Sequence, residues 1–163
     1  MSMIQVHEAR DKILSKIKFK GVEKVSLDQA LGRVLVEDVV SQINNPPLDN
    51  SAMDGYALIA SDIKSATPEK PVQLEVVEEI AAGYEAKGTL KPGQAMRIMT
   101  GAPIPPGANA VLMQEDTEKK SGSILCMDKA DDQENIREAG EDVKIGETVL
   151  KKGVTLSPAH IGM

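Results

Sequence analysis

The chain has 163 residues, 41% of them apolar and 27% charged, so it can bury a core, and this composition argues against intrinsic disorder. Nineteen basic and 25 acidic residues give a net charge of -6, the wrong sign for a protein that works by neutralising nucleic-acid phosphates. No apolar run approaches the roughly 18 residues of a membrane span, and the N-terminus lacks the apolar run of a signal peptide. We therefore expect a soluble cytoplasmic protein that binds neither nucleic acid nor membranes.

Cysteine and histidine are too few for a disulfide or a zinc site. Cys126 is the single cysteine, and the two histidines, His7 and His160, stand at opposite ends of the chain. We expect Cys126 to be a small buried residue of the core.

The first periodic segment predicts an amphipathic helix over residues 6–18. Val6, Ala9, Ile13 and Ile17 recur there at spacings of three and four residues, which places them on one helix face. A capping-box pattern from residue 26 predicts a second, short helical turn, closed by a glycine that takes a left-handed backbone conformation.

The remainder of the chain is predicted to be mainly β. A β-branched run over residues 33–40 indicates a strand or a bent pair of strands, and the apolar residues that follow the first polar loop indicate another. Further short strands are predicted at 72–76, 95–99, 110–113 and 123–127. No long second helix pattern is present to make a parallel crossover, so we expect bent or bifurcated sheets and a small barrel-like part.

The C-terminal residues predict a helix that has only begun. Ser157 can cap free N–H groups, and Pro158 suits the first helical position because its missing donor costs nothing there. Fewer than two turns do not recover the free-energy cost of helix nucleation. We therefore expect the chain to be a fragment of a longer protein.

Candidate chemistry gathers in two loops, since the sequence has no P-loop, no dinucleotide-binding glycine motif and no nucleophile elbow. The first loop spans residues 45–57, where two prolines stiffen its entry and Gly55 permits an unusual backbone angle. Four of its polar residues fall within six positions: Asp49, Asn50, Ser51 and Asp54. Asp49 and Asn50 serve equally well as turn residues that satisfy their own backbone. Asp54, at the entry to a strand, is the candidate to bind a metal ion or a proton.

The second loop spans residues 97–111, where a short strand delivers Thr100 directly to a glycine. The Thr100 hydroxyl and free N–H groups at Gly101 and Ala102 would form a cradle for an anion, which three prolines hold in shape. A plain connection between strands explains these residues equally well. Further along, Arg137 could pair with a phosphate or a carboxylate, and the alternative is a surface ion pair.

Four stretches resemble signatures of the molybdopterin molybdenumtransferase family, the bacterial enzymes related to the E domain of gephyrin. They are DNSAMDGYA at Asp49–Ala57, RIMTGAP at Arg97–Pro103, NIREAGED at Asn135–Asp142 and GVTLSPAHIG at Gly153–Gly162. The four occur in the family's order, and almost no part of the chain lies outside the resemblance.

The resemblance implies that the chain is the N-terminal region of an enzyme that inserts molybdate into adenylylated molybdopterin, releasing AMP with the help of magnesium. Residues 1–45 and 136–163 would form the N-terminal helix and an elongated linker domain, and residues 46–135 a β-rich domain with the active-site loops. The family's pterin-binding and C-terminal domains would be absent, so we expect this fragment to be inactive alone. The full-length protein would be a homodimer with a site shared between subunits, and would work with other proteins of molybdenum cofactor biosynthesis.

Position by position, the resemblance places the catalytic residues at Asp54 and Thr100. Asp54 would hold magnesium or protonate a leaving oxygen, and Thr100 would bond phosphate or molybdate oxygens. Substrate contacts are expected from Ser51, Gly101, Ala102 and Arg137.

Two residues depart from the family pattern, and one alternative function stays open. Asn109 stands where the family often has Asp, and Gln5 stands where Ser usually caps the first helix. The first departure puts a carboxylate role at that turn in doubt, and the second weakens a helix cap. The alternative to an enzyme is a non-catalytic scaffold or dimerisation module of gephyrin-like architecture.

Overall fold

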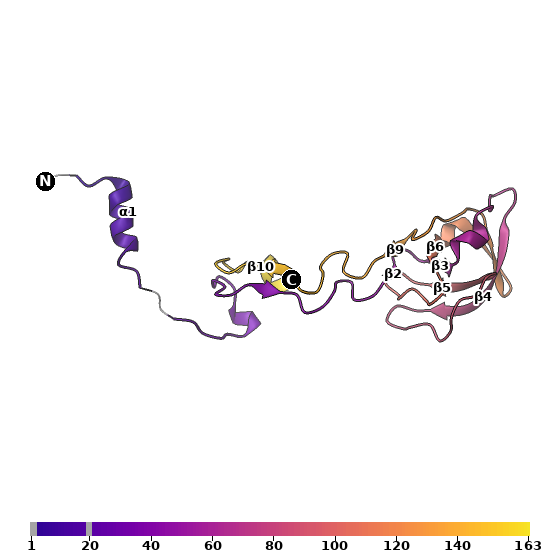
Figure 1. The fold of residues 1–163 in the computed structure, drawn as a ribbon, viewed down its shortest axis with the longest axis horizontal. Coiled ribbons are helices and arrows are strands. Elements are labelled where there is room, and N and C mark those ends of the chain that lie inside the picture. The colour runs from indigo at the N-terminus through magenta and orange to yellow at the C-terminus, as the bar shows by residue number, and fades with distance from the viewer. Residues whose placement is uncertain (1–2, 19–20) are drawn as a thin grey trace. The chain divides into compact units, whose positions relative to one another are not determined.

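The computed structural model describes residues 3–18 and 21–163, and the chain divides into two compact units. One unit comprises Met1–Val39 with Leu150–Met163, and the other comprises Val40–Val149 (Figure 1). The boundaries predicted at 45/46 and 135/136 lie inside the second unit, because the chain segments leading into and out of it pair with each other. The Ser41 N–H donates to the Glu147 carbonyl at 2.9 Å, and Asn45 N–H donates to the Val143 carbonyl at 2.8 Å. The assignment of the predicted domains stays a prediction.

The predicted N-terminal helix is present but shorter than expected. α1 covers Val6–Leu14, none of its residues is buried, and Gln5 makes no side-chain cap hydrogen bond. The Ser15 hydroxyl donates to the Lys12 carbonyl at 2.8 Å, and the next two N–H groups bond three residues back. The helix therefore tightens and ends before residue 18, because a serine hydroxyl competes for a helical carbonyl.

The rest of the first unit joins residues 30–36 to the C-terminal segment. The short 3-10 helix Leu27–Gln29 occupies the predicted turn, although Ser26 makes no side-chain cap bond. Main-chain bonds between residues 32–35 and 153–156 form an antiparallel ladder with a bridge at Val34 and Thr155. β1 (Val39–Val40) pairs with β10 (Thr148–Leu150), so the predicted β-branched run is a bent pair of extended segments.

The predicted C-terminal helix start is confirmed by its capping box. α2 covers Pro158–Gly162, the Ser157 side chain accepts a bond from the His160 N–H, and His160 Nδ1 accepts one from the Ser157 N–H. Among the described residues, no helix has the length and apolar character needed to cross a membrane.

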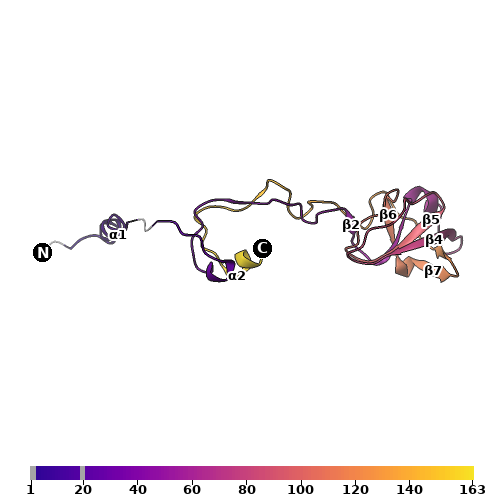
Figure 2. The ribbon, with the colours of Figure 1, turned by 90° about the horizontal axis from the view of Figure 1, so that it is seen from below.

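The second unit is built on a six-stranded sheet with the order β6-β3-β5-β4-β8-β7 (Figures 1 and 2). Its strands are β3 (Gly55–Leu58), β4 (Val72–Ile80), β5 (Gln94–Ile98), β6 (Ala110–Met113), β7 (Thr117–Lys120) and β8 (Ser123–Cys126). The 3-10 helices Ala60–Ile63 and Gln114–Asp116 follow β3 and β6, and β2 (Asn50–Ser51) pairs separately with β9 (Ile136–Arg137). The predicted mainly β class is confirmed, and the strands expected from the apolar runs are all present.

Two features of this sheet differ from the prediction. β7 was not expected, because its sequence is polar, as suits an edge strand with three exposed residues. β4 and β5 run parallel, whereas no parallel crossover was expected. Residues 81–93 connect these two strands without a helix, and a connection of about a dozen residues is long enough for a crossover.

The core of the second unit lies on both faces of the sheet. One cluster contains Tyr56, Leu58 and Ala95, and the other contains Ala57 and Met96, so neighbouring residues of β3 and β5 alternate between them. Burial on both faces explains why these strands are continuous apolar runs in the sequence. Cys126 belongs to the first cluster and is fully buried, as predicted, and burial raises the pKa of its thiol to about 12.

Candidate functional site

The two predicted active-site loops meet at Asp54 and Thr100. β3 begins one residue after Asp54, and its antiparallel register with β5 sets Gly55 opposite Ile98. Thr100 therefore arrives beside Asp54, and both its N–H and its hydroxyl donate to Asp54 Oδ1, each at 2.8 Å. Two residues that the sequence placed in separate loops thus form one polar pair at the end of the sheet.

This pairing lowers the pKa of the Asp54 carboxyl. The Thr100 N–H contributes most to lowering the pKa of the carboxyl, followed by the Thr100 hydroxyl, and the positive charge of Arg97 adds a smaller effect. Partial desolvation opposes these effects without reversing them. At neutral pH Asp54 is therefore a hydrogen-bond acceptor and a fixed negative charge, which suits a cation ligand better than a proton donor.

Gly55 is required for close packing rather than for an unusual backbone angle. Its φ lies outside the left-handed region, so the unusual backbone angle that a glycine permits is not used here. A Cβ atom built on Gly55 would lie 2.1 Å from the Leu112 carbonyl oxygen of the neighbouring β6 strand. The strand that follows Asp54 can approach β6 this closely only because the side chain is missing.

The expected anion cradle of free N–H groups at Gly101 and Ala102 is wrong. The Gly101 N–H donates to the Ser51 carbonyl at 2.8 Å, and the Ala102 N–H donates to the Met99 carbonyl at 2.9 Å. Gly101 adopts a φ of 81°, which turns the chain so that these bonds can form. The Gly101 N–H thus ties the second loop to β2, the Ala102 N–H closes a turn within the loop, and neither group is free for an anion.

The Ser51 side chain stabilises the turn of its own loop. Ser51 is 1% exposed, and its hydroxyl donates to the Met53 carbonyl at 2.5 Å while accepting from the Met53 N–H at 3.3 Å. A side chain that is buried and bonded within its own turn fixes the approach to Asp54. Direct substrate contact by the Ser51 side chain receives no support from this geometry.

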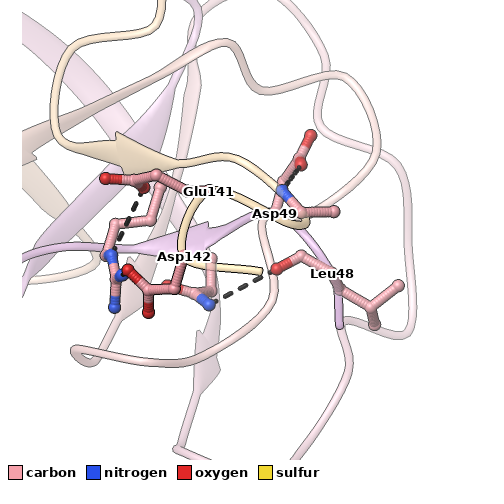
Figure 3. Close-up of polar contacts among 7 residues, drawn as sticks. Leu48, Asp49, Glu141 and Asp142 are labelled. Carbon is pink, nitrogen blue, oxygen red and sulfur yellow. Dashed lines mark hydrogen bonds and ion pairs between the residues drawn. The ribbon is translucent and has the colours of Figure 1, made fainter. Parts of the chain in front are cut away.

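Arg137 forms the ion pairs that were the alternative to anion binding, and Figure 3 labels its two acidic partners, Glu141 and Asp142. Its guanidinium donates to Asp142 at 2.8 Å and to Glu141 at 3.3 Å, and its side chain remains 40% exposed. Asp142, and then Glu141, raise the pKa of the Arg137 guanidinium. A substrate anion would have to compete with two carboxylates for this group.

The remaining polar residues of the first loop hold the backbone in place (Figure 3). Asp49 Oδ1 accepts a bond from the Ala139 N–H at 2.7 Å, and the Asn50 side chain donates to the Leu48 carbonyl at 3.3 Å. Asn50 thus bonds to the backbone of its own turn, which is one of the two roles that the sequence allowed for it. Asp49 instead ties the loop to the turn that carries Ala139.

Asn109, which departs from the family pattern, also has a structural task. Its Oδ1 accepts a bond from the Ala60 N–H at 2.8 Å, and its Nδ2 donates to Asp132 Oδ1 at 2.7 Å. A carboxylate cannot make the second bond, because it has no donor when ionised. The side-chain amide therefore links three segments of the second unit.

Sequence reasoning missed two residues beside Asp54. Arg97 donates through Nη1 to the Gly55 carbonyl at 3.1 Å and through Nη2 to the Gln114 side-chain oxygen at 2.6 Å. The signal in the sequence was a lone arginine, Arg97, within the otherwise apolar run of residues 95–99. Within residues 3–18 and 21–163, no three His, Cys, Asp or Glu side chains come together in a group that could hold a metal ion.

A family model and individual relatives of known name identify the same family for this chain. Residues 4–163 match the family described as the MoeA N-terminal region (domain I and II). The molybdopterin molybdenumtransferase 2 of Mycobacterium tuberculosis is 48% identical over 139 residues, which cover 85% of this chain and 34% of that protein. The molybdopterin molybdenumtransferase of Haemophilus influenzae is 39% identical over 161 residues, which cover 98% of this chain and 39% of that protein.

A solved structure supports the same relationship. The crystal structure of the molybdopterin biosynthesis moeA protein from Pyrococcus horikoshii OT3 superposes with a TM-score of 0.93 at 41% sequence identity. The match covers 99% of this chain and 43% of that one, so the chain spans less than half the length of these relatives. On these matches, the chain belongs to the molybdopterin molybdenumtransferase family, of which it comprises the MoeA N-terminal region.

Proposed function

We propose that this chain is the N-terminal part of an enzyme of molybdenum cofactor biosynthesis that inserts molybdate into adenylylated molybdopterin and releases AMP. The observation that carries the proposal is the Asp54–Thr100 pair, in a chain whose relatives are named molybdopterin molybdenumtransferase. The pair is held at a strand end by two bonds of 2.8 Å and remains partly open to solvent. Polar groups held in fixed positions in this way can stabilise the charge that develops on substrate oxygens during a transfer reaction.

In this proposal Asp54 supplies a fixed negative charge. Its Oδ1 is occupied by Thr100, whereas its Oδ2 accepts no hydrogen bond from the described residues. The free oxygen can bind a cation or a donor group of the substrate. The lowered pKa of Asp54 makes protonation of a leaving oxygen by this residue unfavourable, so binding is the better-supported role.

Asp54 is also the residue that would hold magnesium. One carboxylate with a free oxygen fits this ion, because Mg²⁺ commonly binds one or two carboxylates and takes its other ligands from water and substrate phosphates. When bound, the ion would neutralise negative charge on phosphate oxygens. The role of this chain is to present the Asp54 oxygen in a fixed position.

Thr100 acts through the same carboxylate. Its hydroxyl proton is directed to Asp54, so the hydroxyl would have to rotate before it could donate to a phosphate or molybdate oxygen. Its N–H stays on Asp54 in either case. We propose that the pterin-binding part and the second half of the site belong to the rest of a full-length homodimer, which works with other cofactor-biosynthesis proteins.

The test uses Asp54→Asn and Thr100→Ala in the full-length protein. Asn keeps an acceptor oxygen for Thr100 but removes the charge, so turnover of molybdate insertion should fall at least about tenfold with little change in melting temperature. Thr100→Ala should give a similar loss, and Thr100→Ser, which keeps the hydroxyl, should retain most of the activity. Wild-type turnover in the first two variants would remove the pair from the site and favour a non-catalytic scaffold.

A further inference from the structure

The main chain at Asp54 is held on both sides by one closed set of hydrogen bonds. The Gln114 N–H donates to the Asp54 carbonyl at 3.1 Å, and Arg97 Nη1 donates to the Gly55 carbonyl at 3.1 Å. Arg97 Nη2 then donates to Gln114 Oε1 at 2.6 Å, which joins the two contacts. The carbonyls of two consecutive residues, Asp54 and Gly55, are thereby tied to each other through two side chains.

Strand pairing fixes Arg97 in this position. Arg97 lies on β5 between the buried residues Met96 and Ile98, and the β3–β5 register sets it opposite Tyr56. Its guanidinium lies 5.1 Å from the centre of the Tyr56 ring, and Tyr56 is 5% exposed. Stacking on a buried ring and a planar fork of donors are properties of arginine that lysine does not share.

Gln114 differs from Arg97 because its side chain makes few contacts apart from the bond with Arg97. It is exposed and begins the 3-10 helix after β6, and its amide nitrogen makes one further contact, to Glu115 at 3.3 Å. Substitution of an exposed side chain outside the core usually changes stability little. A loss of activity on changing Gln114 would therefore report on the site and not on the fold.

We propose that Arg97 and Gln114 are positioning residues that act through Asp54: they hold the Asp54–Gly55 main chain so that the carboxylate stays bonded to Thr100 with its second oxygen free. This inference rests on the proposed function, in which Asp54 is the catalytic carboxylate. Without the hydrogen bonds made by the Arg97 and Gln114 side chains, the residues around Asp54 can shift while the β3–β5 pairing persists. A small shift at a catalytic carboxylate is enough to reduce turnover substantially.

The first experiment measures amide hydrogen exchange in the full-length protein, independently of activity. The Thr100 N–H donates to the Asp54 side chain, so its exchange reports whether the carboxylate remains in place. Arg97→Lys and Gln114→Ala should speed exchange at Thr100 by about fivefold, the effect of losing one hydrogen bond. Arg33→Lys and Gln73→Ala, which alter an arginine and a glutamine bonded elsewhere, should leave it unchanged.

The second experiment measures steady-state insertion by the same variants. Gln114→Ala should lower kcat about fivefold or more at unchanged KM and melting temperature, and Gln114→Glu should restore it, because a carboxylate also accepts from Arg97. In the Asp54→Asn background, Gln114→Ala should cause no further loss of turnover, because Gln114 acts through the Asp54 carboxylate that this background already lacks.

The two ideas fail separately. Unchanged Thr100 exchange in Arg97→Lys and Gln114→Ala would overturn the positioning role, whatever the turnover. Equal additional losses from Gln114→Ala in the wild-type and Asp54→Asn backgrounds would also overturn it. Full turnover by Asp54→Asn alone would instead overturn the proposed function.

Discussion

The lowered pKa of Asp54 is due mainly to one neighbouring residue. Thr100 supplies both hydrogen bonds to Oδ1, and these bonds are the main causes of the lowered pKa. Because the folded-state pKa lies below that of the unfolded chain, the ionised carboxylate contributes to stability at neutral pH. That contribution is lost as the pH falls through the lowered folded-state pKa, below about pH 4.

Thr100→Ala should therefore raise the pKa of Asp54 without returning it to the usual aspartate value. The substitution removes the hydroxyl bond but leaves the N–H bond, which is the larger cause of the shift. Carbon-13 NMR of the Asp54 side-chain carboxyl during an acid titration measures this change. An unchanged titration curve in Thr100→Ala would show that the hydroxyl does not stabilise the charge.

Gly55→Ala should destabilise the second unit. The added methyl group would lie 2.1 Å from the Leu112 carbonyl oxygen, so β3 and β6 would have to separate. The expected loss in unfolding free energy is at least about 2 kcal/mol, as for other overpacked sites. Gly88→Ala is the control, since no atom lies within 4 Å of its added Cβ. Denaturant unfolding measures both, and equal stabilities would refute the close-approach explanation.

At the scale of elements, the side chain of Asn109 helps to hold the loop that follows β5 in position. Asn109 connects the start of the 3-10 helix at Ala60 to the segment that carries Asp132. The main chain of Asn109 adds bonds to the Leu58 carbonyl and from the Gln133 N–H. The position of this loop therefore depends on one amide that both accepts and donates.

Asn109→Asp should reduce stability at neutral pH by about 1 kcal/mol or more, since it replaces a donor with a second carboxylate next to Asp132. The double variant Asn109→Asp with Asp132→Asn should recover most of the loss, because Asn at 132 can donate to the new carboxylate. Thermal unfolding of the two variants and of Asp132→Asn alone gives the coupling. A double variant that is no more stable than Asn109→Asp would contradict this pairing.

At the scale of the whole molecule, the buried core is distributed unequally between the two units. Both hydrophobic clusters lie within the second unit, whereas Ala30 is the single buried residue among the described residues of the first. Burial of apolar surface is the main favourable contribution to folding. The second unit therefore holds most of the stabilising contacts within the described chain.

A chain limited to residues 40–149 should fold cooperatively, with a far-UV circular dichroism spectrum dominated by β structure. Its sheet and both clusters lie within these bounds. Thermal unfolding followed by circular dichroism and by near-ultraviolet signals should give one coincident transition. A spectrum of unfolded chain, or two separate transitions, would show that the unit depends on residues outside these bounds.

Local patterns in the sequence determined the class of the fold and singled out the region of the candidate site. Alternating and β-branched runs predicted the strands, and the loops at Asp54 and Thr100 stood out by composition and by resemblance to a family. The strand predictions succeeded because side-chain periodicity and turn chemistry act over a few residues, whereas the site at the two loops stays a prediction. The polar strand β7 was missed because an exposed edge strand carries no such pattern.

Tertiary structure alone decided which polar groups are free. The register of β3 with β5 brings Thr100 to Asp54, and the pairing of the second loop with β2 consumes the N–H group of Gly101. The same register sets Arg97 over Tyr56, within reach of Gly55 and Gln114. No local pattern contains this information, because each of these bonds joins residues that are distant in the chain and meet only when the strands pair.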